Sequence, residues 1–185
     1  MPISIHSTSI GVMTRMLTTL SAMLDTAVTY AQASRLDPAT LLEARLAPDM
    51  HNFVRQVQMA TDTAKFAGAR LAGMIPPSFL DTETSFPELQ ARIDKTLRFL
   101  EIIDPLEVEA SSSRIVTIQH GSRSVSYRGP DYLRQFALPN FYFHVTTAYA
   151  ILRTNRVPLG KLDYLGAFPT DGASVPVEGR RIQYG

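Results

Sequence analysis

The sequence contains no cysteine and no tryptophan among its 185 residues. Without cysteine there is no disulfide, no thiolate metal site, no iron–sulfur cluster and no cysteine nucleophile. The sequence has 18 Lys and Arg and 17 Asp and Glu, so neither sign of charge dominates. This balance disfavours a nucleic-acid-binding surface. No apolar run approaches the roughly 20 residues of a membrane-spanning helix, and the first residues do not resemble a secretory signal. We therefore expect a cytoplasmic protein without nucleic-acid or membrane partners.

Several catalytic motifs are also missing from the sequence. It has no glycine-rich phosphate loop, no HExxH pair and no GxSxG elbow. These absences disfavour a Rossmann enzyme, a P-loop enzyme and an α/β-hydrolase, whose chemistry depends on those motifs.

Apolar residues recur in four stretches at steps of three and four, the spacing of one buried helix face. The stretches lie at 10–31, 50–71, 86–100 and 132–153. Asp49 is expected to cap the second helix and Gly73 to end it. Pro139 either starts or kinks the last helix, because proline cannot donate a hydrogen bond within it. The pattern predicts an all-α four-helix bundle.

Between the third and fourth stretches, residues 115–119 and 124–127 are rich in β-branched side chains and flank Gly121. They predict a small β-hairpin in the crossover before the last helix, and this hairpin must pack on the helices to be stable. After residue 157 glycine and proline become frequent, which predicts an irregular tail. The expected organisation is one bundle domain, 1–166, followed by a C-terminal tail, 167–185.

His144 is the best-placed of the four histidines for chemistry. It lies three residues after Phe141 and four before Ala148, so it shares their inward face. Asn140 lies one turn earlier and points towards the same interior level. One interpretation is a polar, metal-holding end of the bundle. The other is a single core histidine bonded to Asn140 or to the second helix, since a lone histidine is a weak metal signal.

Other polar and aromatic residues are candidates for the same cavity. On the second helix, Gln58 and Asp62 are four residues apart and could orient His144 or bind a cation weakly. In the last helix, Phe141 and Tyr149 belong to an aromatic run that faces a pocket, a partner or the core. Asp62, Phe141 and Tyr149 are thus the candidate substrate-binding residues. Four arginines could bind an anion, but the sequence favours surface placement for them: Arg55, Arg70, Arg134 and Arg153.

Four segments of the sequence, 45–50, 55–62, 137–149 and 160–166, resemble the DinB/YfiT-like superfamily of metal-dependent four-helix bundles. Within it, the chain is similar to a bacterial and fungal branch classed only as a domain of unknown function. In the superfamily, three histidines bind a divalent metal, one from the second helix and two from an HxxxH pair in the last. The matching positions here are Gln58, Asn140 and His144, and amides are poor ligands for such metals. The resemblance therefore implies a degenerate or absent metal site, a small-molecule cavity and a homodimer.

Three functions remain open from the sequence. The leading hypothesis is an enzyme of isomerase, cyclase or lyase type that processes a small molecule, with a degenerate or absent metal site and no identified cofactor. In it His144 is the general acid/base, and Asn140 and Gln58 orient it or bind substrate oxygens. The second is a non-catalytic module that binds a ligand or dimerises. The third is a divalent-metal hydrolase or thiol transferase that recruits Asp62 or His6 as a further ligand.

Overall fold

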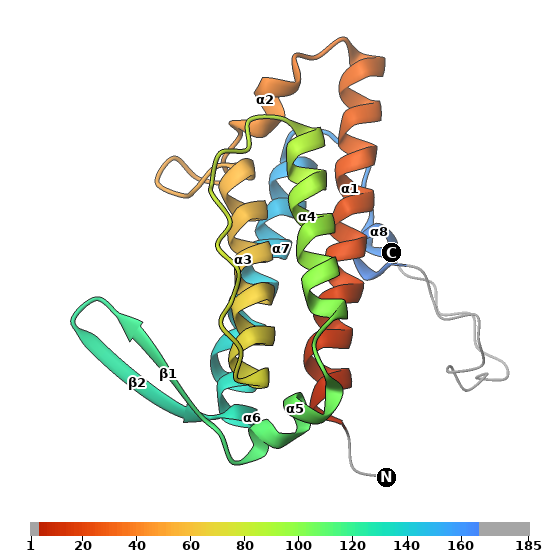
Figure 1. Ribbon diagram of the computed structural model, residues 1–185. Coiled ribbons are helices and arrows are strands. Elements are labelled where there is room, and N and C mark those ends of the chain that lie inside the picture. The colour runs from red at the N-terminus through yellow and green to blue at the C-terminus, as the bar shows by residue number, and fades with distance from the viewer. Residues whose placement is uncertain (1–3, 167–185) are drawn as a thin grey trace, which may run out of the picture.

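Four long helices dominate the computed structural model, which describes residues 4–166 (Figure 1). They are α1 (Val12–Ser34), α3 (Phe53–Ala72), α4 (Phe86–Glu101) and α7 (Leu138–Thr154). Their apolar stripes face one continuous core, in which Leu17, Val57 and Phe141 are fully buried. The expected four-helix bundle is confirmed, because the spacing of three and four residues keeps one face of each helix away from water.

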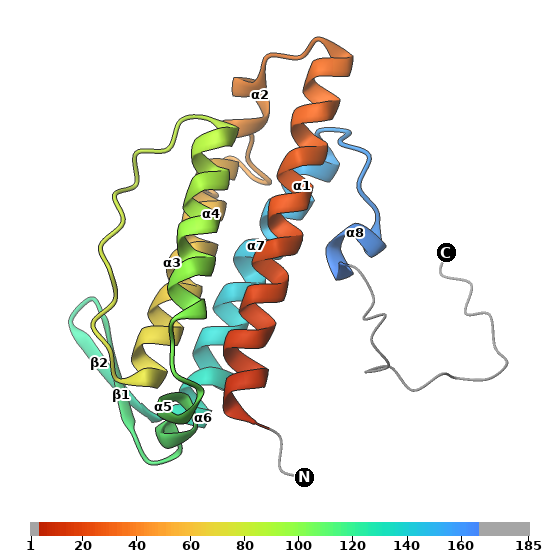
Figure 2. The same cartoon turned by 45° about the vertical axis from the view of Figure 1, so that its right-hand side comes forward.

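Short elements connect and flank the long helices. They are η1 (Ser7–Gly11), α2 (Pro38–Leu42), α5 (Pro105–Glu109), η2 (Ala110–Ser112), α6 (Gly129–Tyr132), η3 (Leu133–Ala137) and α8 (Lys161–Leu165). The last of these, α8, packs on the outer side of α1 (Figure 2), so the chain is not irregular throughout the region after residue 157. The predicted tail 167–185 lies outside the described residues. None of the helices in 4–166 combines the length and apolarity required to cross a bilayer.

The helices form a ring in which α1 and α3 each contact both α4 and α7. The connection between α3 and α4, residues 74–85, runs along the whole length of the bundle (Figure 2), so these two helices are parallel. We call this segment the strap. Twelve extended residues reach about 40 Å, enough to span the roughly 30 Å of a 20-residue helix. The sequence pattern instead predicted the long crossover before the last helix. The connection between α4 and α7, however, begins and ends at the same end of the bundle (Figure 1).

The predicted hairpin is present as antiparallel strands β1 (Ile115–His120) and β2 (Arg123–Arg128). It extends from the end of the bundle where α6 lies (Figure 1). Val116 and Ile118 of β1 are buried, whereas β2 is mostly exposed. The hairpin therefore rests on the helices through one strand, as its short length requires.

The observed ends of α3 agree in part with those predicted from the sequence. Asn52, not Asp49, caps α3, and its side-chain oxygen accepts a hydrogen bond from the backbone nitrogen of Arg55 at 3.0 Å. Asp49 lies too early because residues 46–50 form turns before the helix begins. Gly73 ends α3 as expected, with a φ of 69° that glycine adopts without strain.

Pro139 lies inside one helical run from Gly129 to Thr154. The turn before it, η3, is a π-helix, in which the backbone nitrogen of Leu138 donates to the carbonyl of Leu133, five residues earlier. Proline has no N–H for the next intrahelical bond, so a widened turn accommodates it without ending the helix.

Candidate functional site

His144 is buried on the inner face of α7 and pairs with α3. Its side chain is 4% exposed, and its Nδ1 lies 2.8 Å from Oε1 of Gln56. The amide nitrogen of Gln56 in turn donates to the backbone carbonyl of His51 at 3.2 Å. Because the remaining amide oxygen of Gln56 can only accept, the neutral imidazole carries its proton on Nδ1 and leaves Nε2 unprotonated.

The environment of His144 disfavours its charged form. Burial, together with the nearby positive charges of His51 and Arg55, lowers its pKa from 6.5 to about 4. The ring is therefore neutral at pH 7 and has no proton to donate as an acid on Nε2. This finding argues against the acid half of the expected acid/base role.

Gln58 and Asn140, the other two expected members of the site, have separate partners. The amide nitrogen of Gln58 donates to Oε2 of Glu83 at 2.9 Å, and its oxygen accepts from Arg55 at 3.2 Å. Asn140 donates from Nδ2 to Oγ1 of Thr63 at 2.9 Å. Neither amide hydrogen-bonds to His144, which the sequence could not show, because helix spacing fixes a face but not a rotamer.

These residues do not fit the metal site that the resemblance implies. Each of the three is held by a different partner, and two of them are amides. Within residues 4–166, no three side chains of His, Asp or Glu lie close enough to form a metal site. The donor set thus suits structural hydrogen bonds better than a transition metal.

A charged residue of α4, Arg92, lies buried in the bundle with its side chain 1% exposed. Its guanidinium contacts carboxylate oxygens of Asp62 at 2.9 Å, Asp81 at 3.0 Å and Glu83 at 3.0 Å, and Nε donates to Oγ1 of Thr61 at 2.8 Å. Asp81 and Glu83 belong to the strap, so these bonds hold the strap against α3 and α4. Arg92 was missed in the sequence, although it sits three residues after the core residue Leu89, on the buried side of the helix.

Lys65 of α3 extends the same network. Its side chain is 2% exposed, its Nζ lies 2.8 Å from Oδ1 of Asp62, and it stands 4.3 Å from the ring centroid of Phe79 on the strap. Arg55 closes the network by pairing with Asp81. Its members are three cations, Arg55, Lys65 and Arg92, and three carboxylates, Asp62, Asp81 and Glu83, so their formal charges sum to zero. We call this set the strap network.

A cleft of about 250 Å³ lies between α3 and the helical run from α6 to α7. We call it the α3–α7 cleft. Asp62, a member of the strap network, also lines this cleft. Its lining is Arg55, Met59, Asp62, Thr63, Phe66, Arg70, Ile118, Tyr132, Phe136 and Asn140. Five of the six residues from α3 recur at spacings of three and four, and Thr63 lies next to Asp62, so all six lie on one face of that helix. Asp62 and Asn140 are the expected site residues that the structure brings to one cavity.

Aromatic rings and one arginine shape the end of the cleft near β1. Tyr132 and Phe136 are stacked, with centroids 6.0 Å apart. The hydroxyl of Tyr132 accepts a hydrogen bond from Arg70 at 3.2 Å, and the guanidinium lies 5.2 Å from the ring centroid of Phe66. Burial raises the pKa of Tyr132, with Arg70 opposing the shift, so the phenol is neutral at pH 7. The sequence favoured surface placement of Arg70 over anion binding, because helix periodicity does not show which neighbour covers a half-buried residue.

Phe141 and Tyr149, the other expected substrate-binding residues, lie elsewhere. Phe141 is fully buried in the core, with its ring 5.9 Å from that of Tyr142. Tyr149 packs edge-on against Tyr164 of α8, with centroids 5.6 Å apart. Neither lines the α3–α7 cleft. Their contacts are those of packing residues.

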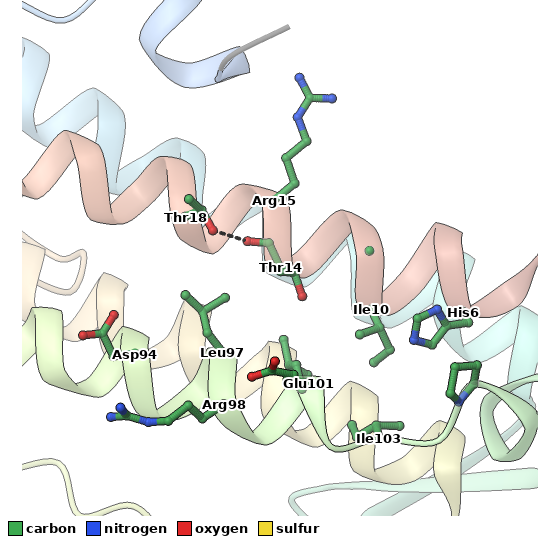
Figure 3. Close-up of a pocket in the computed structure, with 13 residues that line it drawn as sticks. His6, Ile10, Thr14, Arg15, Thr18, Asp94, Leu97, Arg98, Glu101 and Ile103 are labelled. Carbon is green, nitrogen blue, oxygen red and sulfur yellow. Dashed lines mark hydrogen bonds between the residues drawn. The ribbon is translucent and has the colours of Figure 1, made fainter. Parts of the chain in front are cut away.

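A larger hollow of about 740 Å³ lies between α1 and α4 (Figure 3). Its buried lining is aliphatic, from Ile10, Leu100 and Ile103. Arg15 points away from α4 (Figure 3) and donates to the carbonyl of Leu165 at 2.9 Å. The charged side chains from α4 are exposed on the rim, so this groove has no desolvated polar group to orient a small ligand.

Comparison with known proteins identifies the family. The model of a domain of unknown function, DUF1993, matches residues 5–165, which include the whole bundle and the α3–α7 cleft. A crystal structure of a DinB family member protein from Shewanella denitrificans is similar to the chain. It has 37% sequence identity and a TM-score of 0.83 over 92% of this chain and 95% of that one. No curated protein matches significantly. The chain therefore belongs to the DUF1993 family, a DinB-like domain of unknown function.

Proposed function

We propose that this protein binds a small organic molecule in the α3–α7 cleft. The observation that carries the proposal is the lining of that cleft, where rings of Phe66, Tyr132 and Phe136 meet polar groups that the fold leaves partly unused. Asn140 donates one hydrogen bond to Thr63, and its amide oxygen has no hydrogen-bond partner within residues 4–166. Small-molecule sites typically combine apolar walls with a few such polar atoms.

The local backbone supports the same proposal. Phe136 belongs to η3, whose π-helical turn contains an extra residue compared with an α-helical turn. Such turns are frequent at functional sites, because they reorient a side chain and cost some helix stability. Here the turn directs Phe136 onto Tyr132 at the wall of the cleft.

Binding without catalysis is the function that the geometry supports best. A catalytic His144 has one favourable feature, since Gln56 fixes the tautomer and leaves Nε2 as an acceptor. Its pKa of about 4 makes the imidazole a weak base at pH 7. His144 is also absent from the lining of the α3–α7 cleft. We therefore assign His144 a structural role in joining α7 to α3.

Binding can be tested by titrating the protein, labelled with ¹⁵N, with phenol, benzyl alcohol and 4-hydroxybenzoate while recording its amide spectrum. We expect at least one probe to shift the amide signals of the cleft residues, and Phe136→Leu to abolish the shifts. Phe143→Leu is the matched control, because Phe143 lies on the same helical run but is 54% exposed. The proposal fails if no probe shifts cleft signals, or if the two variants behave alike.

A further inference from the structure

Arg70 is the cation of the α3–α7 cleft that has no carboxylate within salt-bridge distance among residues 4–166. Arg55, at the other end, is paired with Asp81. The contacts of Arg70 are instead the hydroxyl of Tyr132 and the faces of two rings, with centroids 5.2 Å and 5.8 Å from its Cζ. These contacts orient the planar guanidinium without neutralising it, which leaves its remaining donors available to an anion.

The charge balance of the cleft limits which anion fits. Asp62 also lines the cleft, but its Oδ1 accepts bonds from both Lys65 and Arg92, within the neutral strap network. The net charge that remains at the cleft is the single positive charge of Arg70. A monoanion balances this charge, whereas a dianionic phosphate would leave a surplus negative charge near Asp62. A carboxylate also matches the fork of an arginine through two parallel hydrogen bonds.

Acceptor atoms lie further along the cleft. The hydroxyl of Thr63 donates to the carbonyl of Met59 at 2.7 Å, so its oxygen can only accept from Asn140. This fixes the orientation of the Asn140 amide and leaves its Oδ1 as a spare acceptor. Oδ2 of Asp62 has no hydrogen-bond partner within residues 4–166. These acceptors favour a ligand that carries a hydroxyl or amino donor at the end away from its carboxylate.

The size and the walls of the cleft indicate what joins the two polar ends. Its volume of about 250 Å³ equals about eight water molecules at roughly 30 Å³ each, which is room for one ring and a short substituent. Asp62 and Arg70 are eight residues apart on α3, or about 12 Å along the axis, and part of that length is filled by the side chains themselves. Phe66 and Phe136 offer flat aromatic surfaces between them, and the buried ring of Tyr132 stacks against Phe136.

We infer that the α3–α7 cleft selects a small aromatic monocarboxylate with a hydroxyl or amino donor opposite the acid group. The carboxylate binds Arg70, the ring packs between Phe66 and Phe136, and the donor reaches Asn140 or Asp62. This inference rests on the proposed function, because it names the ligand class of the same site.

The inference is tested by measuring dissociation constants for 4-hydroxybenzoate and phenol at pH 7, using the same amide titration. We expect 4-hydroxybenzoate to bind about ten- to hundredfold more tightly than phenol, the range of a hydrogen-bonded charge pair. Arg70→Gln should abolish this preference, measured as the ratio of the two dissociation constants in the same variant. Arg134→Gln is the matched control, since Arg134 pairs with Asp131 on the same helical run and is 70% exposed. Arg70→Lys keeps the charge without the fork and should retain part of the preference.

Each result has a defined meaning. A carboxylate preference that is lost in Arg70→Gln and kept in Arg134→Gln supports the inference. If 4-hydroxybenzoate and phenol bind the cleft equally well, the ligand class is wrong, although the proposed function stands. If inorganic phosphate displaces 4-hydroxybenzoate at equal concentration, the site is a general anion site and the inference is overturned. Absence of any shift at the cleft removes the proposed function and the inference together.

Discussion

Helix α3 has two polar surfaces, and their cations differ in burial and in whether a carboxylate pairs with them. Towards the strap, Arg92 and Lys65 are almost fully buried, and each lies within 3.0 Å of a carboxylate. Towards α7, Arg70 is half-buried against aromatic rings and has no carboxylate partner within residues 4–166. Asp62 lies at the boundary, because it bonds to the strap network and also lines the cleft.

The difference separates structural charge from charge that is available for binding. A buried cation must be matched inside the protein, because removing it from water costs several kcal/mol. A half-buried cation with rings on its faces keeps part of its hydration and remains open to an outside partner. Arginines in the same bundle can therefore be assigned different roles from the groups that surround them.

The largest effect is expected from Arg92→Met, which leaves three carboxylates without their shared cation. Breaking a buried ion pair costs about 3 to 5 kcal/mol, and we expect about 3 kcal/mol because the carboxylates are partly exposed. Urea unfolding at pH 7 measures the loss, and Arg92→Lys, which retains a charge, should lose less. A loss below about 1 kcal/mol would show that the strap network does not stabilise the bundle.

The next largest effect on the free energy of unfolding is expected from the neutral pair His144 and Gln56, and it depends on pH. The unfolded chain binds a proton at His144 below pH 6.5, whereas the folded protein does so only below about pH 4. Stability should therefore fall as the pH decreases from 6.5 to 4, by up to about 3 kcal/mol. Urea unfolding across this range, compared with His144→Gln, isolates the effect, because the carboxylates titrate in both proteins. Equal pH slopes in the two proteins would contradict the lowered pKa.

A smaller effect is expected from Tyr132→Phe, which removes the hydroxyl that accepts from Arg70. Since Tyr132 is 1% exposed, we expect a loss of about 1 kcal/mol, the usual value of one hydrogen bond. Tyr30→Phe is the control, because the hydroxyl of Tyr30 has no hydrogen-bond partner within the described range 4–166. If both variants unfold at the same urea concentration as the parent, Tyr132 does not hold Arg70 in place.

A loss of similar size is expected from Arg70→Met, the same substitution as the first at a different arginine. No carboxylate of residues 4–166 loses a partner, but the hydroxyl of Tyr132 loses its donor, so the free energy of unfolding should fall by about 1 kcal/mol, well below the loss in Arg92→Met. Urea unfolding at pH 7 measures this change in the free energy of unfolding. A loss as large as that of Arg92→Met would mean that Arg70 is structural, and the contrast between the two surfaces of α3 would disappear.

Much of the fold was predictable because it depends on local spacing. The apolar stripes located all four long helices, Gly73 marked an end, and the β-rich residues around Gly121 located the hairpin. The parallel course of α3 and α4 was not predictable, because the strap contains no regular element of its own. Arg92 holds the strap in place by joining Asp81 and Glu83 to Asp62 of α3, which lies 30 residues before Arg92 in the sequence.

The site was less predictable than the fold. The spacing of Phe141, His144 and Ala148 correctly placed His144 on a buried face, and all three are buried. It could not show that Gln56, not Gln58 or Asn140, would bond to the ring. Helix periodicity defines directions to within a face, whereas a hydrogen bond at 2.8 Å also depends on rotamers and on how the helices pack.

The sequence by itself determined the helices, the hairpin and the inward position of His144, since each follows from residues within a few turns of one another. Only the tertiary structure decided which polar groups are satisfied and which are left for a ligand. Asp62 and Arg70 are on one helix, yet the strap covers the first and the rings of α6 and η3 border the second. A charge acquires its role from the groups that surround it after folding, because burial and pairing set its energy together.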